Sequence, residues 1–182
     1  YELDWRRDKE EVRSGLFNIG FPWIKGSFED FLVGDGGAAA LEIGYETARL
    51  AHQQGATVIL NAAPTRAIAP DVLQLTDILI VNKVEADALL GTAIKSADDA
   101  ISALENAFTS IQLFIVTLGS GGLVYRSGAE APAFLPAFDV NVISSHGAGD
   151  SFVGALTCEL AKGEPFIEAL RYANAAAALR VS

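Results

Sequence analysis

The chain has 182 residues, 51% of them hydrophobic, which is enough to bury the core of one globular domain spanning residues 1–182. Lys and Arg total 13 against 23 Asp and Glu, and the net charge of −10 argues against nucleic acid or an anionic membrane as a partner. No apolar run approaches the roughly 18 residues of a membrane span, and no signal peptide is visible, so we expect a cytoplasmic protein.

Residues 1–40 give no clear pattern, and regular elements become recognisable after Leu41. The first is an amphipathic helix that ends at Gly55. Short apolar strands and intervening helices follow, with strands at 57–60, 77–81 and 113–117 and helices at about 83–90 and 97–108. Continuous apolar strands separated by helices are typical of a parallel sheet covered on both faces.

The C-terminal part predicts an antiparallel edge and two more helices. Short strands at 123–125 and 133–135 have no helix between them, which favours antiparallel pairing. Helices at about 150–161 and 165–180 complete an α/β fold, a three-layer sandwich with a mostly parallel central sheet. Cys158 lies among apolar residues of the first of these helices and is expected to be a buried structural thiol. The sequence contains no Met and its last helix has no stop signal, which predicts an incomplete domain.

Polar residues follow two of the predicted parallel strands, at the sheet edge where such folds bind ligands. Asn82 and Glu85 come one helical turn apart after the strand at 77–81. This spacing lets both side chains face a ligand at the sheet edge, or they can simply cap the following helix. The glycine-rich loop at 117–122 follows the next strand, and it serves either as a nucleotide loop or as a hairpin-like turn.

The stretch at 144–153 carries the strongest chemical signal. Gly147, Ala148 and Gly149 are small enough for an anion to approach the backbone, and a helix predicted from Ser151 would direct free amides and its positive dipole end toward that anion. Asp150 at this rim would repel a phosphate unless it accepts a proton from an attacking hydroxyl. The alternative is that Asp150 only caps the helix.

This stretch, Gly-Ala-Gly-Asp followed by Ser-Phe-Val-Gly-Ala-Leu, closely resembles the signature of the ribokinase-like, or PfkB, family of carbohydrate kinases. The Asn-Lys-Val-Glu run at 82–85 is similar to the family's Asn-x-x-Glu motif, and the resemblance covers roughly residues 40–182. It implies a ribokinase-like fold in which Gly147, Ala148 and Gly149 form an anion hole and Asp150 is the catalytic base that contacts the substrate hydroxyl.

The resemblance also implies an ATP site and part of a sugar site. The implied nucleotide-binding residues are Asn82, Thr117, Leu118, Gly119, Ser120, Gly121, Gly122, Gly149 and Asn174. Glu85 is the implied Mg²⁺ residue, acting through water. Glu42 resembles the acid of the family's Gln-Leu-Glu run, which contacts sugar hydroxyls, although Ala40 replaces the Gln.

Two features depart from the family pattern. Many members have Asp-Thr-Thr before the glycine loop, and its Asp and second Thr help to hold a monovalent cation; here the run is Ser144-Ser145-His146, which lacks that carboxylate. Ser144 and His146 are therefore weak candidates for a K⁺ site, and His146 either orients the loop or is an ordinary loop histidine. The family's N-terminal sugar-recognition segment and its small β lid are not recognisable.

We therefore expect a ribokinase-like carbohydrate kinase that phosphorylates a sugar hydroxymethyl group with ATP and Mg²⁺. A nucleoside is the alternative substrate. A nucleotide-binding domain that is catalytically incomplete or regulatory is the alternative function. A dehydrogenase is disfavoured because no Gly-x-Gly-x-x-Gly follows a first strand. The expected partners are the sugar and ATP, and homodimer formation stays open.

Overall fold

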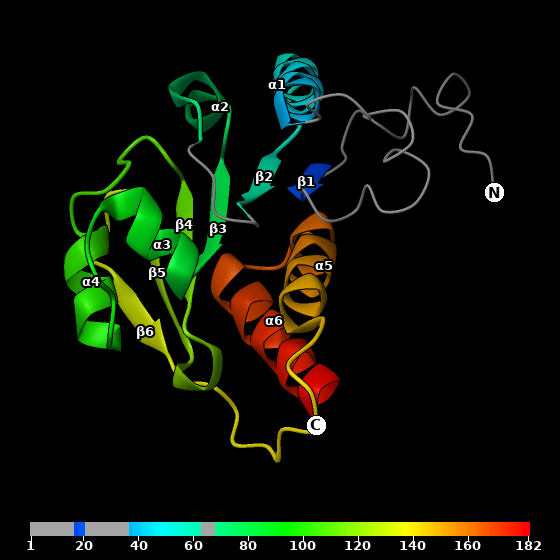
Figure 1. Cartoon of the computed structure of the whole chain (residues 1–182). Coiled ribbons are helices and arrows are strands. Elements are labelled where there is room, and N and C mark those ends of the chain that lie inside the picture. The colour runs from blue at the N-terminus through cyan, green and yellow to red at the C-terminus, as the bar shows by residue number, and fades with distance from the viewer. Residues whose placement is uncertain (1–16, 21–36, 63–67) are drawn as a thin grey trace.

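A six-stranded sheet organises the part of the chain that the computed structural model describes, which is residues 17–20, 37–62 and 68–182 (Figure 1). The strands lie in the order β1-β2-β3-β4-β5-β6. The parallel strands are β1 (Phe17–Gly20), β2 (Val58–Asn61), β3 (Ile78–Asn82) and β4 (Leu113–Thr117). The antiparallel strands are β5 (Leu123–Ser127) and β6 (Ala133–Leu135). The predicted parallel sheet with an antiparallel edge is confirmed.

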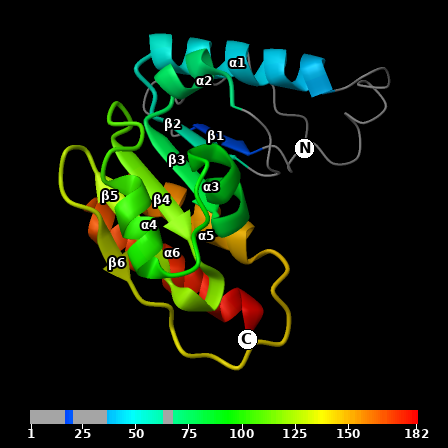
Figure 2. The same cartoon turned by 60° about the vertical axis from the view of Figure 1, so that its left-hand side comes forward.

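Helices cover both faces of this sheet and make the three layers. Their bounds are α1 (Gly37–Gln53), α2 (Pro70–Gln74), α3 (Lys83–Leu90), α4 (Ala97–Leu104), α5 (Ala148–Ala161) and α6 (Phe166–Val181). Helices α3 and α4 lie on one side of the sheet, whereas α5 and α6 lie on the other (Figure 2). Among the described helices, none is both long enough and apolar enough to cross a membrane.

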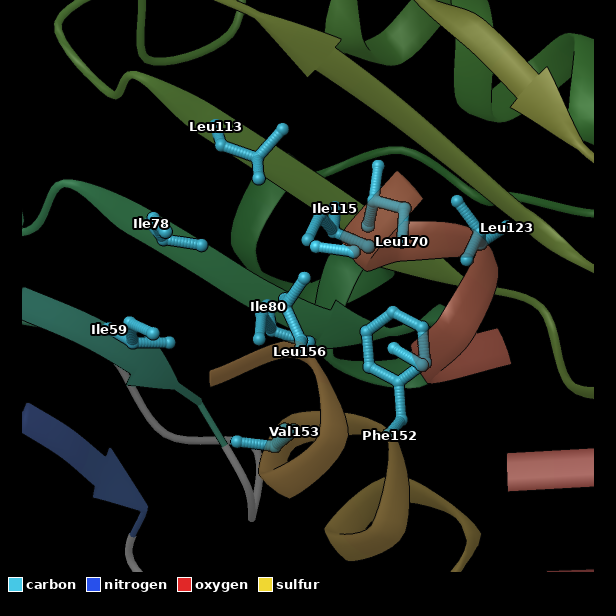
Figure 3. Close-up of a cluster of buried hydrophobic side chains, with 12 residues drawn as sticks. Ile59, Ile78, Ile80, Leu113, Ile115, Leu123, Phe152, Val153, Leu156 and Leu170 are labelled. Carbon is cyan, nitrogen blue, oxygen red and sulfur yellow. The ribbon is translucent and has the colours of Figure 1, made fainter. Parts of the chain in front are cut away.

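The alternation of side chains along the central strands divides the core between the two faces. Ile78 and Ile80 of β3 pack toward α5 and α6, whereas Leu79 and Val81 pack toward α3 and α4. Figure 3 shows the first cluster, in which Phe152 from α5 lies among the strand side chains. This buried contact fixes the position of α5, and with it the position of the glycine loop before it.

Three details differ from the sequence prediction. Helix α5 begins at Ala148 rather than near Ser151, so the Gly-Ala-Gly-Asp run forms its cap and first turn. Helix α4 ends at Leu104 instead of reaching Phe108, whose φ of 46° is incompatible with a continuing helix. Cys158 is exposed, not buried, because it lies two residues, or about 200°, around the helix from the buried Leu156.

Candidate functional site

A pocket of about 510 Å³ lies where β4 ends, beside the first turn of α5 and the last turns of α6. Its walls come from the loop after β4, the segment after β6, and the two C-terminal helices. The residues that line it are Thr117, Gly119, Ser120, Gly122, Leu123, Ala137, Phe138, Asp139, Val140, Val142, Ser145, Ala148, Gly149, Phe152, Asn174, Ala177, Ala178 and Val181. Six of the nine predicted nucleotide-binding residues are in this set; Asn82, Leu118 and Gly121 are not.

Two predicted residues lie next to each other at the carboxyl ends of the central strands. Asn82 ends β3 and is the register partner of Thr117, which ends β4. The Thr117 hydroxyl donates to the carbonyl of Val81 at 3.4 Å, which holds this side chain against the neighbouring strand. The sheet therefore brings the Asn82 motif and the loop after β4 to one edge, as the parallel arrangement predicts.

Asn82 and Glu85 form a reciprocal cap at the start of α3. The Glu85 amide donates to the Asn82 side-chain oxygen at 3.0 Å, and the Asn82 amide donates to Glu85 Oε2 at 2.7 Å. Glu85 is only 5% exposed, and burial raises the pKa of its carboxyl, while the hydrogen bonds from Asn82 act in the opposite direction. The helix-capping alternative is thus present in the structure, and it orients both side chains at the sheet edge.

The loop after β4 turns through a short 3₁₀ segment, η3 (Gly119–Gly121). Leu118 donates its amide to the carbonyl of Gly122 at 2.8 Å, and its side chain packs into the core on the α3 side. Gly122 has φ 88° and ψ −143°, a conformation that is essentially restricted to glycine. Two glycines of this turn, Gly119 and Gly122, line this end of the pocket together with Thr117, Ser120 and Leu123.

The glycine loop before α5 leaves its amides available. Gly147 is the N-cap of α5 in the left-handed region, with φ 76°, and no side chain caps the helix. Within the described residues, the amides of residues 147–150 donate to no acceptor, whereas the amide of Ser151 donates to the carbonyl of Gly147 at 2.9 Å. Since the free amides coincide with the positive end of the helix dipole, this turn is a favourable seat for an anion.

Asp150 is the third residue of α5 and is exposed. It is not the N-cap, so the alternative that it caps the helix is wrong. Asp150 is not among the pocket residues, although Ala148 and Gly149 in the same turn are. Its side chain is therefore accessible to solvent, and it belongs to the same first turn as the free amides.

Asn174 reaches the pocket from α6. Its side-chain nitrogen donates to the carbonyl of Pro136 at 2.7 Å, and this bond ties α6 to the segment after β6. The bond fixes the amide orientation, so the side-chain oxygen is left to accept a hydrogen bond from a ligand.

Ser144 and His146 lie on the approach to the glycine loop. The Ser144 hydroxyl lies 3.3 Å from His146 Nδ1 and accepts from the His146 amide at 3.4 Å, and the imidazole is exposed. The hydroxyl is thus already engaged within the loop, which matches a loop-orienting role better than a cation site.

Glu42 lies within α1, which precedes β2, whereas the residues that line the pocket all follow β3 in the sequence. Only the backbone of Glu42 is described. Its predicted contact with sugar hydroxyls therefore stays a prediction.

Sequence reasoning missed one wall of the pocket. Phe138, Asp139, Val140 and Val142 line it from the segment between β6 and α5. This segment has neither helical nor strand periodicity, and its position depends on distant backbone bonds, such as that from the Ile143 amide to the carbonyl of Val181 at 2.7 Å. No local sequence signal could have identified these residues.

Similarity to known proteins defines the class to which this protein belongs. The chain matches the pfkB family of carbohydrate kinases over residues 30–182, and it belongs to this family. It is 32% identical over 136 residues to the ribokinase of Haemophilus influenzae, an alignment that covers 74% of this chain and 44% of that protein. The chain thus spans less than half the length of this relative.

Solved structures agree with the fold. The ribokinase of Arabidopsis thaliana complexed with ribose and ATP superposes with a TM-score of 0.72 at 28% identity, covering 78% of this chain and 46% of that one. The aminoimidazole riboside kinase of Salmonella enterica gives a TM-score of 0.66 at 27% identity, covering 79% and 52%. The predicted family and ribokinase-like fold are therefore confirmed.

Proposed function

We propose that this chain is the nucleotide-binding and phosphoryl-transfer part of an ATP-dependent sugar kinase. The observation that carries the proposal is the pair formed by the pocket and the free amides of residues 147–150, which meet at the first turn of α5. Membership of a carbohydrate kinase family supports the same reaction class.

The pocket fits a nucleotide in size and chemistry. Its volume of about 510 Å³ lies within the range of roughly 300–1,000 Å³ found for small-molecule sites. Apolar side chains such as Phe138, Val140 and Val181 suit the faces of a base, and Asn174 adds a hydrogen-bonding group. Gly149 borders the pocket, so phosphates that extend from it reach the free amides of the α5 turn.

In the proposed reaction, Asp150 accepts the proton of a substrate hydroxymethyl group as its oxygen attacks the terminal phosphorus of ATP. The bond to the bridging oxygen of ADP breaks as the new oxygen–phosphorus bond forms. The amides of residues 147–150 stabilise the negative charge on the transferring group, because they are already oriented and need no reorganisation. A positioned general base contributes about 10²–10⁴-fold to such a step.

Mg²⁺ is expected to accompany ATP and to neutralise phosphate charge. Among the residues that the structure describes, no group of three or more His, Cys, Asp or Glu side chains could hold a metal by itself. Magnesium bound with a nucleotide needs only one or two carboxylates, often through water, because the phosphates provide other ligands. Glu85 fits the role of such a carboxylate, because the cap with Asn82 holds its side chain at the carboxyl edge of the sheet.

A monovalent cation fits this loop less well. Ser144 offers one hydroxyl that already contacts His146, and neither residue provides a carboxylate. We therefore assign no step of the reaction to K⁺.

A pentose or a related riboside is the best-supported substrate class, because the similar proteins include a ribokinase and an aminoimidazole riboside kinase. Glu42 is the proposed contact to sugar hydroxyls. A nucleotide-binding domain without transfer activity is the second candidate, and the position of Asp150 outside the pocket lining favours it.

Calorimetric titration with ATP, followed by ribose, fructose or a nucleoside, separates the two candidates. The kinase proposal predicts ATP binding and then binding of one of these alcohols. ATP binding without any alcohol binding would support the second candidate. Absence of ATP binding would contradict both.

A further inference from the structure

We propose that the guanidinium of Arg180 is a phosphate ligand of this site and binds the terminal phosphate of ATP together with the free amides of the glycine loop. The inference rests on the proposed function, because it assumes that ATP occupies the pocket. It adds a positive side chain to a site that the sequence motifs present as backbone and acids only.

The first observation is the position of the side chain. A Cβ built on Gly147 would lie 3.1 Å from Nε of Arg180, 3.4 Å from Nη2 and 3.5 Å from Cζ. The guanidinium thus lies against the α-carbon of the residue that caps α5, next to the first of the free amides. Glycine at position 147 leaves the room that this contact needs.

The second observation is the backbone that holds Arg180 there. The carbonyl of Val181 accepts from the amide of Ile143 at 2.7 Å and from that of Ser144 at 3.3 Å. These bonds join the last turn of α6 to the segment that leads into the glycine loop. Arg180 immediately precedes Val181, so the base of its side chain is fixed relative to the proposed phosphate site.

The third observation is the absence of a competing partner. Within the described residues, the guanidinium forms no hydrogen bond and no ion pair; the ion pairs found there join Glu46 to Arg49, Glu159 to Lys162 and Glu168 to Arg171. An arginine near the carboxyl end of a helix can donate to the last carbonyls of that helix. The exposed guanidinium of Arg180 makes no such bond among the described residues and lies against Gly147 instead.

The charges near the glycine loop favour a positive side chain at the position of Arg180. The carboxyl end of α6 lies beside the amino end of α5, because its last turn is bonded to the segment before the loop. Its negative dipole end would repel an anion bound at the α5 amides, and Asp150 adds a further negative charge. A positive side chain between the two helix ends offsets both effects, and Arg can donate two parallel hydrogen bonds to a phosphate.

The test compares the affinity of the 182-residue chain for ATP and for adenosine by calorimetry, in wild type, R180M, R180K and R171M. Arg171 is the matched control, since it lies on the same helix, is exposed and pairs with Glu168. We expect R180M to weaken ATP binding about tenfold or more, as for the loss of a charged hydrogen bond, and to leave adenosine binding unchanged. R180K should bind ATP with intermediate affinity, and R171M should match wild type.

Each other result overturns the inference. Wild-type ATP affinity in R180M removes Arg180 from the phosphate site while the proposed function stands. Equal losses for ATP and adenosine, together with a lower unfolding temperature, indicate a structural role at the end of α6. Failure of the wild-type chain to bind ATP contradicts the proposed function itself, and the Arg180 inference with it.

Discussion

Replacing Gly122 with Ala tests the most demanding contact in the pocket wall. Gly122 directly precedes β5 and passes close to the segment after β6. A Cβ at this position would lie 2.3 Å from the carbonyl oxygen of Leu135, 2.8 Å from the amide nitrogen of Ala137 and 2.9 Å from the α-carbon of Pro136. All three are backbone atoms, so no side-chain rotation relieves the overlap.

Two terms set the size of the effect. The conformation at φ 88° and ψ −143° costs about 1–3 kcal/mol for a residue with a Cβ. Overpacking against the backbone adds about 1–3 kcal/mol. We therefore expect G122A to lower the free energy of unfolding by about 2–6 kcal/mol, a large part of the 5–15 kcal/mol typical of a domain.

Gly128→Ala is the matched control at the other end of the same strand. Gly128 also has a positive φ, 53°, but a Cβ there would meet nothing within 4 Å. Only the left-handed backbone term remains, about 1–2 kcal/mol. Urea denaturation followed by circular dichroism measures both variants, and ATP titration of folded G122A should show weaker binding because Gly122 lines the pocket. A loss of stability for G122A no larger than that for G128A would refute the close approach of Gly122 to the segment after β6.

The remaining predictions concern charge and exposure. Arg126 is 2% exposed and donates to three backbone carbonyls, so R126M should lower the free energy of unfolding by about 3–5 kcal/mol in urea denaturation; a loss below 1 kcal/mol would show that these bonds are dispensable. Burial raises the pKa of Glu85 in the folded state, so the folded state holds this proton more tightly than the unfolded state does. The free energy of unfolding should therefore fall as the pH rises from the ordinary Glu pKa through the raised pKa. E85Q should lose that dependence in unfolding titrations between pH 4 and 8, and an unchanged profile would assign it to another group. Because Ser144 provides no carboxylate, exchanging K⁺ for Na⁺ should leave ATP affinity within about twofold, and a larger change would restore a cation site here. Cys158 should react with a thiol reagent in the native state, whereas slow reaction limited by unfolding would contradict its exposure.

The central strands could be predicted because their burial on both faces requires unbroken apolar runs. Leu79 and Val81 face one layer while Ile78 and Ile80 face the other, and both sets must be apolar. Strand β1 gives no such signal, since its four residues include a polar Asn18 and lie in a stretch without periodicity. Its pairing with β2 is a property of the assembled sheet.

The start of α5 was predicted too late because glycine has a low helix propensity. The packing of Phe152 and Leu156 against the sheet fixes the helix, and the first turn then extends back to Ala148. This extension matters for the site, since it makes Asp150 a first-turn residue rather than a cap.

Motifs in the sequence pointed to the strand-end loop and the glycine loop because local backbone chemistry defines both. The wall made by Phe138 and Val142 and the contact of Arg180 with Gly147 depend on long-range packing between α6 and an irregular segment. Such contacts join residues that are far apart in the sequence, and no local sequence pattern predicts them. Only the three-dimensional structure reveals them.

The most direct test of the central claim is phosphoryl transfer from ATP to ribose by wild type and by D150N, with ATP affinity measured on the same samples. Removing the base should reduce kcat by about 10²–10⁴-fold. ATP should bind equally or more tightly, because the substitution removes a negative charge beside the phosphate site. A D150N variant that keeps a kcat near that of wild type would contradict the assignment of Asp150 as the base of this reaction.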